Sequence, residues 1–265
     1  MSGHRGPELR ALGRTLVCRP RAGQRAGPLR PGPRSAGRTP AIFAEEYTSL
    51  LAPGSIDRLE VILGRSIGRL TREEFESERP ILEALDGHSR VAILVVGDPF
   101  AATTHTALRV AAERAGHTWH YVPNASILTA AASFLGLMHY RFGRTVSIPF
   151  PAPGYAPTSF LDGIRENRQR GLHTLVLLDL RPAERTFLTA GEAIGILRER
   201  DAPGTALPPG TELAVVARIG TDDPAAGYGL PEVLIRIDFG PPLHALVVPA
   251  GPLHEVEAAA VARFR

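Results

Sequence analysis

The chain has 265 residues, enough for one large domain or two small ones, and its 44% hydrophobic content is typical of a globular protein. All 30 basic residues are arginine. Nine of them lie in residues 1–40 beside one acidic residue, so the remainder is mildly acidic and lacks the basic, aromatic-lined patch of a nucleic-acid-binding surface. The single cysteine, Cys18, excludes an intramolecular disulfide and favours a cytoplasmic protein, and no apolar stretch is long enough to cross a bilayer.

The basic first segment, residues 1–40, contains six prolines and seven glycines and shows no sustained hydrophobic period. Such a composition buries too little apolar surface to form a core. The sequence therefore predicts that this segment is disordered or only loosely held.

Strands and helices alternate in the next hundred residues. Thr71 followed by Glu74 is a capping-box pattern, and Gly116 is typical of a helix end. The expected elements are strands at 41–45, 67–70, 91–96 and 118–122, helices at 56–63, 71–84 and 104–115, and a buried apolar helix that is opened by residues 123–127 and ends near 138. This order is typical of a βαβ sheet with parallel strands.

The run at 91–96 is the most informative segment. Six consecutive apolar residues fit a fully buried parallel strand, Gly97-Asp98-Pro99 ends it, and Thr103 and Thr104 can cap the helix that follows. Loops after such strands are where open α/β sheets bind small ligands. We therefore expect a ligand site at this turn.

The second half of the chain also alternates. Strands are expected at 145–150, 173–180, 212–219, 233–237 and 245–248, and helices at 158–170, 190–200 and 253–262. The strands at 233–237 and 245–248 are close enough in sequence to pair antiparallel. We predict an α/β protein with an N-terminal lobe at 41–140, which has a mainly parallel sheet, and a C-terminal lobe at 141–265, which has a mixed sheet.

Seven motifs occur in a fixed order along residues 41–265. They are Ala44-Glu45-Glu46-Tyr47-Thr48-Ser49, Gly97-Asp98-Pro99 with Ala102-Thr103-Thr104-His105, Asn124-Ala125-Ser126-Ile127, Tyr140-Arg141-Phe142-Gly143, Gly171-Leu172-His173-Thr174-Leu175 with Leu178-Asp179, Ala217-Arg218-Ile219-Gly220, and Asp238-Phe239-Gly240 with Pro242-Leu243-His244. In this order they closely resemble the diphthine synthases, and the compact spacing at 188–193 is similar to archaeal members. That family belongs to the tetrapyrrole-methylase-like class of S-adenosylmethionine methyltransferases.

The resemblance implies two α/β lobes with S-adenosylmethionine in the cleft between them, usually in a homodimer. The implied substrate is a protein, translation elongation factor 2, whose modified histidine is methylated on its amino group during diphthamide biosynthesis. Archaeal members of the family are taken to stop at the trimethylated amine, whereas eukaryotic members also form a methyl ester.

The resemblance also implies a set of cofactor contacts in this chain. Carried over position by position, they fall on Asp98, Ala101, Ser126, Ile127, Leu177, Ile219 and His244. The Asp98 carboxylate can accept hydrogen bonds from ribose hydroxyls or the methionine ammonium, and apolar side chains can flank adenine. The His244 imidazole is expected to contact the adenine edge or simply to line the pocket.

Residues 1–40 depart from the family pattern. Family members begin with an apolar strand and a Gly-Leu-Gly-Leu loop that touch the cofactor, and residues 15–20 are a poor substitute for them. The departure implies a disordered or incorrectly translated segment. It also implies unpaired backbone groups on the neighbouring strands and a pocket open on one side.

The sequence identifies no catalytic base. His105, Glu45 and Tyr47 are candidates for the pocket rim, and each is equally suited to holding a loop by hydrogen bonds. The nine histidines show no metal-ligand spacing, so no metal is expected. Two other functions stay open: a relative that no longer binds the cofactor and acts only as a binding protein, and a methylase of tetrapyrroles.

Overall fold

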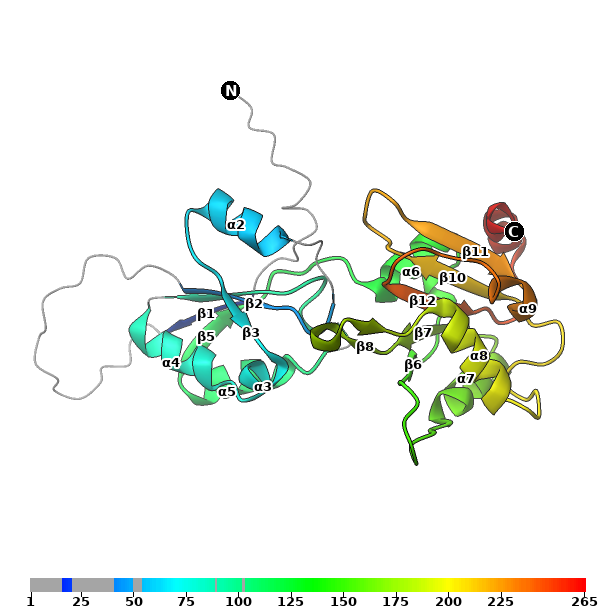
Figure 1. Cartoon of the computed structure of the whole chain (residues 1–265), viewed down its shortest axis with the longest axis horizontal. Coiled ribbons are helices and arrows are strands. Elements are labelled where there is room, and N and C mark those ends of the chain that lie inside the picture. Colours follow the sequence, from blue (N-terminus) through cyan, green and yellow to red (C-terminus); the bar gives the residue numbers. More distant parts are fainter. Residues whose placement is uncertain (1–15, 21–40, 50–53, 89, 102) are drawn as a thin grey trace, which may run out of the picture. The chain divides into compact units, whose positions relative to one another are not determined.

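The chain divides into two compact units. The computed structural model describes residues 16–20, 41–49, 54–88, 90–101 and 103–265 (Figure 1). Unit 1 is Met1–Ser126 and unit 2 is Ile127–Arg265. The division falls at 126/127 and not at the predicted 140, because the apolar helix α6 (Ile127–Leu135) packs on the sheet of unit 2. Residues 1–15 and 21–40 of the predicted loose segment lie outside the described residues.

Unit 1 contains a five-stranded, mainly parallel sheet in the order β3-β2-β4-β1-β5. Strand β2 pairs in parallel with both β3 and β4, whereas β1 is antiparallel to both of its neighbours. The strands are β1 (Leu16–Pro20), β2 (Ala41–Glu45), β3 (Gly68–Leu70), β4 (Val91–Leu94) and β5 (His117–His120).

Strand β1 corrects the expectation that all of residues 1–40 are disordered or only loosely held. Its backbone lies between two strands, with Val17 opposite Ala92 of β4 and His120 of β5. Strand β1 therefore supplies hydrogen-bond partners to backbone groups of β4 and β5 that the sequence predicted to be unpaired.

Helices cover both faces of the unit 1 sheet. Helices α3 (Arg72–Glu76), α4 (Arg79–Gly87) and α5 (Thr106–Arg114) pack on one face through a cluster that includes Phe75 and Ile93. Helix α2 (Ser55–Leu63) packs on the opposite face, where Leu59 meets Ala44 (Figure 1). The alternation of Ile93 and Leu94 between these two clusters shows why β4 is apolar along its whole length.

The prediction of one helix at 71–84 is wrong in its continuity. Thr71 and Glu74 form the predicted capping box at the start of α3, but the helix ends after one turn. Glu78 then adopts a left-handed conformation with φ of 61°, and α4 begins with Pro80 in its first turn. Because proline cannot donate a backbone hydrogen bond and fits the start of a helix, α4 is a separate element.

Unit 2 contains a five-stranded mixed sheet in the order β11-β10-β12-β7-β6. Only β6 and β7 pair in parallel, and the other neighbours are antiparallel. The strands are β6 (Val146–Ile148), β7 (Thr174–Leu178), β10 (Leu213–Ala217), β11 (Ala225–Gly229) and β12 (His244–Val248), and β8 (Leu180–Arg181) and β9 (Thr186–Phe187) form a separate hairpin.

The predicted strand at 233–237 is wrong. Pro231 opens the short helix α9 (Pro231–Leu234), and β12 pairs with β10 and β7. The strand beside β10 is β11, whose sequence of alanine, glycine and tyrosine has low strand propensity. Gly227 is required there, since a Cβ atom would lie 2.8 Å from the Phe239 ring.

Two helical layers enclose the unit 2 sheet. Helices α7 (Ser159–Gln169) and α8 (Ala190–Arg200) pack on one face, and α6 and α10 (Glu255–Val261) on the other. Short 3-10 turns lie at η1 (His139–Arg141), η2 (Pro182–Glu184) and η3 (Ala262–Phe264). Among the described residues, no helix has the length and apolar character needed to span a membrane.

Candidate functional site

Three strands of unit 1 end at one edge of the sheet, and polar residues stand at those ends. Glu45 ends β2, Gly97 and Asp98 follow β4, and Tyr121 follows β5. Strands β2 and β4 are parallel, and β5 runs in the same direction because β4 and β5 are both antiparallel to β1. Loops at such an edge commonly bind ligands. We call residues 97–101 the Asp98 turn.

The Asp98 carboxylate is the best-connected polar group of this turn. It accepts hydrogen bonds from the backbone N–H of Phe100 (2.9 Å), the backbone N–H of Asn124 (3.2 Å) and the hydroxyl of Tyr121. Burial raises the pKa of this carboxyl group, but the donors outweigh burial and hold the pKa below its ordinary value. The backbone N–H of Ala101 also stabilises the charged form, so four protein donors surround the carboxylate.

The structure brings the other predicted contacts of unit 1 next to this turn. The N–H of Ala101 donates to the main-chain oxygen of Asp98 (3.2 Å), and the Asn124 amide donates to the carbonyl oxygen of Gly97 (3.3 Å). Gly97 has a φ of +88°, a conformation that favours glycine. The half-buried Ser126 lies two residues after Asn124. The hydrogen bond between Asn124 and Gly97 therefore joins two loops that carry predicted cofactor contacts.

The three candidates for the pocket rim are not at an exposed rim. Glu45 and His105 are each 1% exposed, and the Tyr47 hydroxyl is buried. The Glu45 carboxylate accepts hydrogen bonds from the backbone N–H groups of Tyr47 (3.2 Å) and Thr48 (3.1 Å). Glu45 therefore holds the loop after β2, and its carboxylate faces its own chain.

In unit 2, the predicted apolar contacts share one face of the sheet. Ile127 begins α6, Leu177 lies in β7 and Ile219 follows β10, and all three pack partly buried on the same core cluster. Ala245 of β12 lies opposite Leu177 and belongs to that cluster. Their partial exposure leaves apolar surface that can pack against a flat aromatic ring.

The His244 side chain lies on the opposite face of the same sheet. It neighbours Ala217, which belongs to the other core cluster. Its Nδ1 accepts from the backbone N–H of Ala190 (3.1 Å) at the start of α8, and its Nε2 lies 3.1 Å from the carbonyl oxygen of Gly240. Burial lowers the pKa of His244, although nearby carbonyl groups oppose this shift. Both ring nitrogens thus have backbone partners inside unit 2. This arrangement does not favour the expected contact of the imidazole with adenine.

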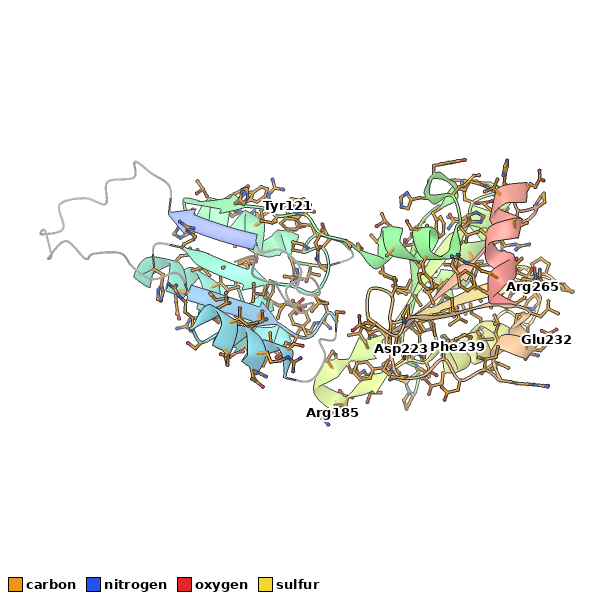
Figure 2. All side chains as sticks on the ribbon, turned by 90° about the horizontal axis from the view of Figure 1, so that it is seen from above. Tyr121, Arg185, Asp223, Glu232, Phe239 and Arg265 are labelled. Atoms are coloured by element: carbon orange, nitrogen blue, oxygen red, sulfur yellow. The ribbon has the colours of Figure 1, made fainter. Side chains whose placement is uncertain are left out.

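Arg218 fixes the loop that carries Ile219. Arg218 has a positive φ of 50°, and its guanidinium donates to the carbonyl oxygens of Phe239 (2.6 Å), Pro241 (2.7 Å) and Asp223 (3.0 Å). Figure 2 labels Asp223 and Phe239 in unit 2. Because one side chain is bonded to two loops, the position of Ile219 is coupled to that of residues 239–241.

Sequence reasoning missed Tyr121 and the role of Arg218. Tyr121 lay near the end of the predicted strand at 118–122 and follows the observed strand β5, at the same sheet edge as Asp98, and that position was the available signal. No local pattern indicates the hydrogen bonds of Arg218 to Phe239 and Pro241, because these two partners lie more than twenty residues away in sequence. Within the part of the chain that the structure describes, no three His, Cys, Asp or Glu side chains are grouped as metal ligands.

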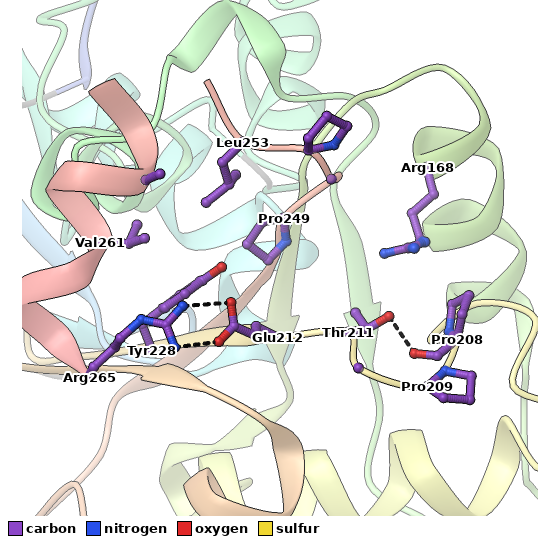
Figure 3. Close-up of a pocket in the computed structure, with 14 residues that line it drawn as sticks. Arg168, Pro208, Pro209, Thr211, Glu212, Tyr228, Pro249, Leu253, Val261 and Arg265 are labelled. Carbon is purple, nitrogen blue, oxygen red and sulfur yellow. Dashed lines mark hydrogen bonds and ion pairs between the residues drawn. The ribbon is translucent and has the colours of Figure 1, made fainter. Parts of the chain in front are cut away.

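A cavity of about 440 Å³ lies elsewhere in unit 2, and none of the predicted cofactor residues lines it (Figure 3). It is at the start of β10 and the end of β12, whereas Ile219 and His244 lie at the other end of these strands. The Arg265 guanidinium pairs with both carboxylate oxygens of Glu212 (2.7 and 3.0 Å) at its wall. The cavity is therefore separate from the candidate site.

Comparison with known proteins gives one consistent result. Residues 40–226 match the family of tetrapyrrole (corrin/porphyrin) methylases. A diphthine synthase of Methanothermobacter thermautotrophicus is 43% identical over 222 residues, which cover 82% of each chain. A diphthine synthase of Methanocaldococcus jannaschii is 38% identical over 229 residues, 84% of this chain and 87% of that one.

A solved structure agrees with these relatives. A crystal structure of diphthine synthase superposes with a TM-score of 0.75 and 33% identity, and covers 84% of each chain. The sheet order, the Asp98 turn and the sequence matches thus lead to one conclusion. The chain belongs to the tetrapyrrole methylase family, in the branch formed by the diphthine synthases.

Proposed function

We propose that the protein transfers methyl groups from S-adenosylmethionine to the amino group of the modified histidine of translation elongation factor 2, in diphthamide biosynthesis. The observation that carries this proposal is the similarity to diphthine synthases over more than four fifths of the chain. Membership of a methylase family supports the reaction class. The proposed substrate follows from the names of the relatives.

The Asp98 turn fits the polar part of S-adenosylmethionine. Its ionised carboxylate suits a ribose hydroxyl or the ammonium group of the methionine part, which would replace one of the donors that it has in the free protein. Gly97 carries no side chain and its φ is positive, so a ligand can approach the backbone closely. We propose that Asp98, Ala101 and Ser126 hold this part of the cofactor.

The apolar face of unit 2 fits the adenine ring. Ile127, Leu177 and Ile219 supply apolar surface, and Arg218 fixes the loop that carries Ile219. We propose that these three side chains pack on adenine and that residue 244 contributes its main chain. Its imidazole is already bonded to Ala190 and Gly240.

The residues of this chain are proposed to act mainly by positioning. S-adenosylmethionine, when bound, supplies a methyl group on a positively charged sulfur, which a neutral amine accepts by in-line displacement. Alignment of such reacting groups can lower a barrier by about 7–11 kcal/mol. Asp98 would contribute to that alignment by fixing the polar end of the cofactor.

Two measurements test the proposal. Calorimetric titration should show micromolar binding of S-adenosylmethionine, and absence of binding would favour the alternative of a cofactor-incompetent binding protein. Incubation with elongation factor 2 that carries the unmethylated precursor of diphthine should then raise the mass of that substrate in steps of about 14 Da. A tetrapyrrole incubated in parallel should stay unchanged, and methylation of the tetrapyrrole alone would replace the proposed substrate.

We also propose a homodimer, on the family resemblance alone. Sedimentation at micromolar concentration should give twice the mass of one chain, about 57 kDa for a 28.4 kDa protomer. A single species with the mass of one chain would contradict it.

A further inference from the structure

His105 is a fully buried histidine that is bonded to the Asp98 turn. It is 1% exposed and occupies the N-cap position of α5. Its Nδ1 lies 2.9 Å from the carbonyl oxygen of Pro99, and the Thr103 hydroxyl donates to the same oxygen, also at 2.9 Å. Two side chains from outside the turn thus hold one carbonyl group within it.

The partners of His105 define its proton arrangement. A carbonyl oxygen only accepts, so Nδ1 must carry a hydrogen, and in the neutral ring Nε2 then has an unshared electron pair. Burial lowers the pKa of His105, although the Glu45 carboxylate and the Pro99 carbonyl oppose this shift. The ring is therefore neutral when it donates to Pro99.

Packing prevents Nε2 from meeting a substrate. This atom is buried and makes no hydrogen bond with the described residues. The Phe75 ring lies 4.5 Å from the imidazole, centroid to centroid, and the Tyr47 ring contacts it edge-on at 6.2 Å. The imidazole is thus fixed by aromatic neighbours, and it does not present a proton acceptor at a surface.

The Pro99 carbonyl group that His105 binds is rigidly connected to one of the hydrogen-bond donors of the Asp98 carboxylate. The C=O of Pro99 and the N–H of Phe100 belong to one planar peptide group. That N–H donates to the Asp98 carboxylate at 2.9 Å. If the Pro99 carbonyl rotates, the Phe100 N–H must rotate with it and leave the carboxylate.

We propose that His105 is a positioning residue for cofactor binding: through the peptide group between Pro99 and Phe100, its Nδ1–H fixes the orientation of the Asp98 carboxylate. The inference rests on the proposed function for its effect on S-adenosylmethionine. The peptide connection itself is a property of the free protein. His105 thereby has a role other than proton transfer, since its Nε2 atom is buried.

Paired substitutions of His105 test the inference. His105→Phe keeps an aromatic ring and removes the donor, so it should weaken S-adenosylmethionine binding and raise KM for the cofactor about tenfold, with kcat at saturation little changed. His105→Asn can place an amide N–H near the position of Nδ1, so it should recover most of the affinity. Phe75→Leu is the control, because it loosens packing on the ring and leaves the donor in place.

A second readout needs no cofactor. In the free protein, NMR should show the Nδ1–H tautomer of His105, and the pKa of Asp98 should rise in His105→Phe because the Phe100 donor is lost. If His105→Phe does not fold, His105→Leu removes the donor with a smaller apolar side chain. An Nε2–H tautomer, or equal Asp98 pKa values in the wild type and in the donor-less variant, overturns the inference.

The two proposals fail in different ways. A wild-type protein that does not bind S-adenosylmethionine contradicts the proposed function, while the NMR comparison still decides the role of His105. Normal binding by the wild type together with equal affinities of His105→Phe and wild type rejects His105 as a positioning residue.

Discussion

At the scale of single residues, the site depends on how Asp98 is kept charged. A half-buried carboxylate is costly unless donors surround it, and Asp98 has donors from its own turn and from the chain after β5. The buried strand predicted a ligand site at this turn, and the family resemblance assigned a cofactor contact there to Asp98. The sequence could not predict Tyr121 as a donor or the burial of Glu45, because both depend on which loops meet at the sheet edge.

Asp98→Asn should weaken S-adenosylmethionine binding tenfold to a hundredfold, corresponding to about 1.5–3 kcal/mol for a hydrogen bond to a charged group. The fold should be retained, since an amide oxygen in the position of Oδ1 still accepts from Phe100, and the amide nitrogen can donate to the Tyr121 hydroxyl. Titration calorimetry measures the change, with Asp57→Asn on exposed α2 as the control. An unchanged affinity would remove the Asp98 charge from the proposed contacts.

At the scale of elements, the Tyr-Arg-Phe-Gly motif connects three parts of unit 2. Arg141 pairs with Glu257 of α10, and Phe142 forms a bridge with His173. Gly143 lies against Asn167, which donates to the carbonyl oxygen of Arg144 (2.8 Å). The motif that contributed to the family resemblance is therefore structural at these positions.

Gly143→Ala should destabilise the protein by about 1–3 kcal/mol. The added Cβ atom would lie 2.1 Å from Oδ1 of Asn167, whose side chain is buried and bonded to its neighbours. Gly87→Ala is the matched control: no atom lies within 4 Å of its added Cβ, and it should be neutral or stabilising by about 0.5–1 kcal/mol. Urea unfolding measures both, and similar effects of the two substitutions would contradict the close contact.

The errors in element prediction have physical causes. The capping box at Thr71 was predicted correctly, because it depends only on residues three positions apart. The break at Glu78 was missed although Pro80 is a local signal for a helix start, because the capping box and the apolar spacing favoured one continuous helix and a left-handed glutamate itself has no sequence signal. Strand β11 was missed because glycine and alanine have low strand propensity, and the contact that requires Gly227 is with Phe239, a residue distant in sequence.

At the scale of the molecule, unit 2 is held together by a buried ionic cluster. The Glu257 carboxylate, fully buried, accepts from the backbone N–H of Met138 (2.9 Å) and from Nε2 of His173 (3.0 Å), and pairs with Arg141. His173 in turn accepts from Ala250 N–H at 2.9 Å. The cluster thus connects α10 with the end of α6 and the start of β7.

Acid should destabilise unit 2 through this cluster. Burial raises the pKa of Glu257, but the hydrogen bonds outweigh it and lower the pKa from 4.5 to about 2. A carboxyl group with a lowered folded-state pKa stabilises above about pH 4.5, and this contribution, about 3 kcal/mol, is lost as the pH falls toward 2. For His173, burial lowers the pKa from 6.5. The contribution of the neutral His173 ring to stability is therefore also lost as the pH falls.

Glu257→Gln should therefore lower the midpoint of thermal unfolding at pH 7 and reduce its dependence on pH between about 4.5 and 2. Glu255→Gln, at an exposed position on the same helix, is the control. Unfolding curves across this pH range provide the measurement. A steep acid dependence that persists in Glu257→Gln would assign the effect to other carboxyl groups.

The two-lobed α/β architecture was predictable from alternating strand and helix patterns. The boundary was not, because α6 is apolar enough to belong to either sheet and only its packing on Leu175 and Ala245 assigns it to unit 2. The set of cofactor contacts came from the resemblance. The structure adds that the apolar members share a face and that the His244 imidazole lies on the other.

The placement of β1 has a consequence for solubility. A short strand from the arginine-rich start of the chain separates the interior strand β4 from the edge strand β5, and both strands form hydrogen bonds with it. Detachment of those five residues would leave unpaired backbone groups on both neighbouring strands, including the apolar β4. Unpaired strand edges can pair with a second molecule, so self-association in cells or on storage would begin at β4 and β5.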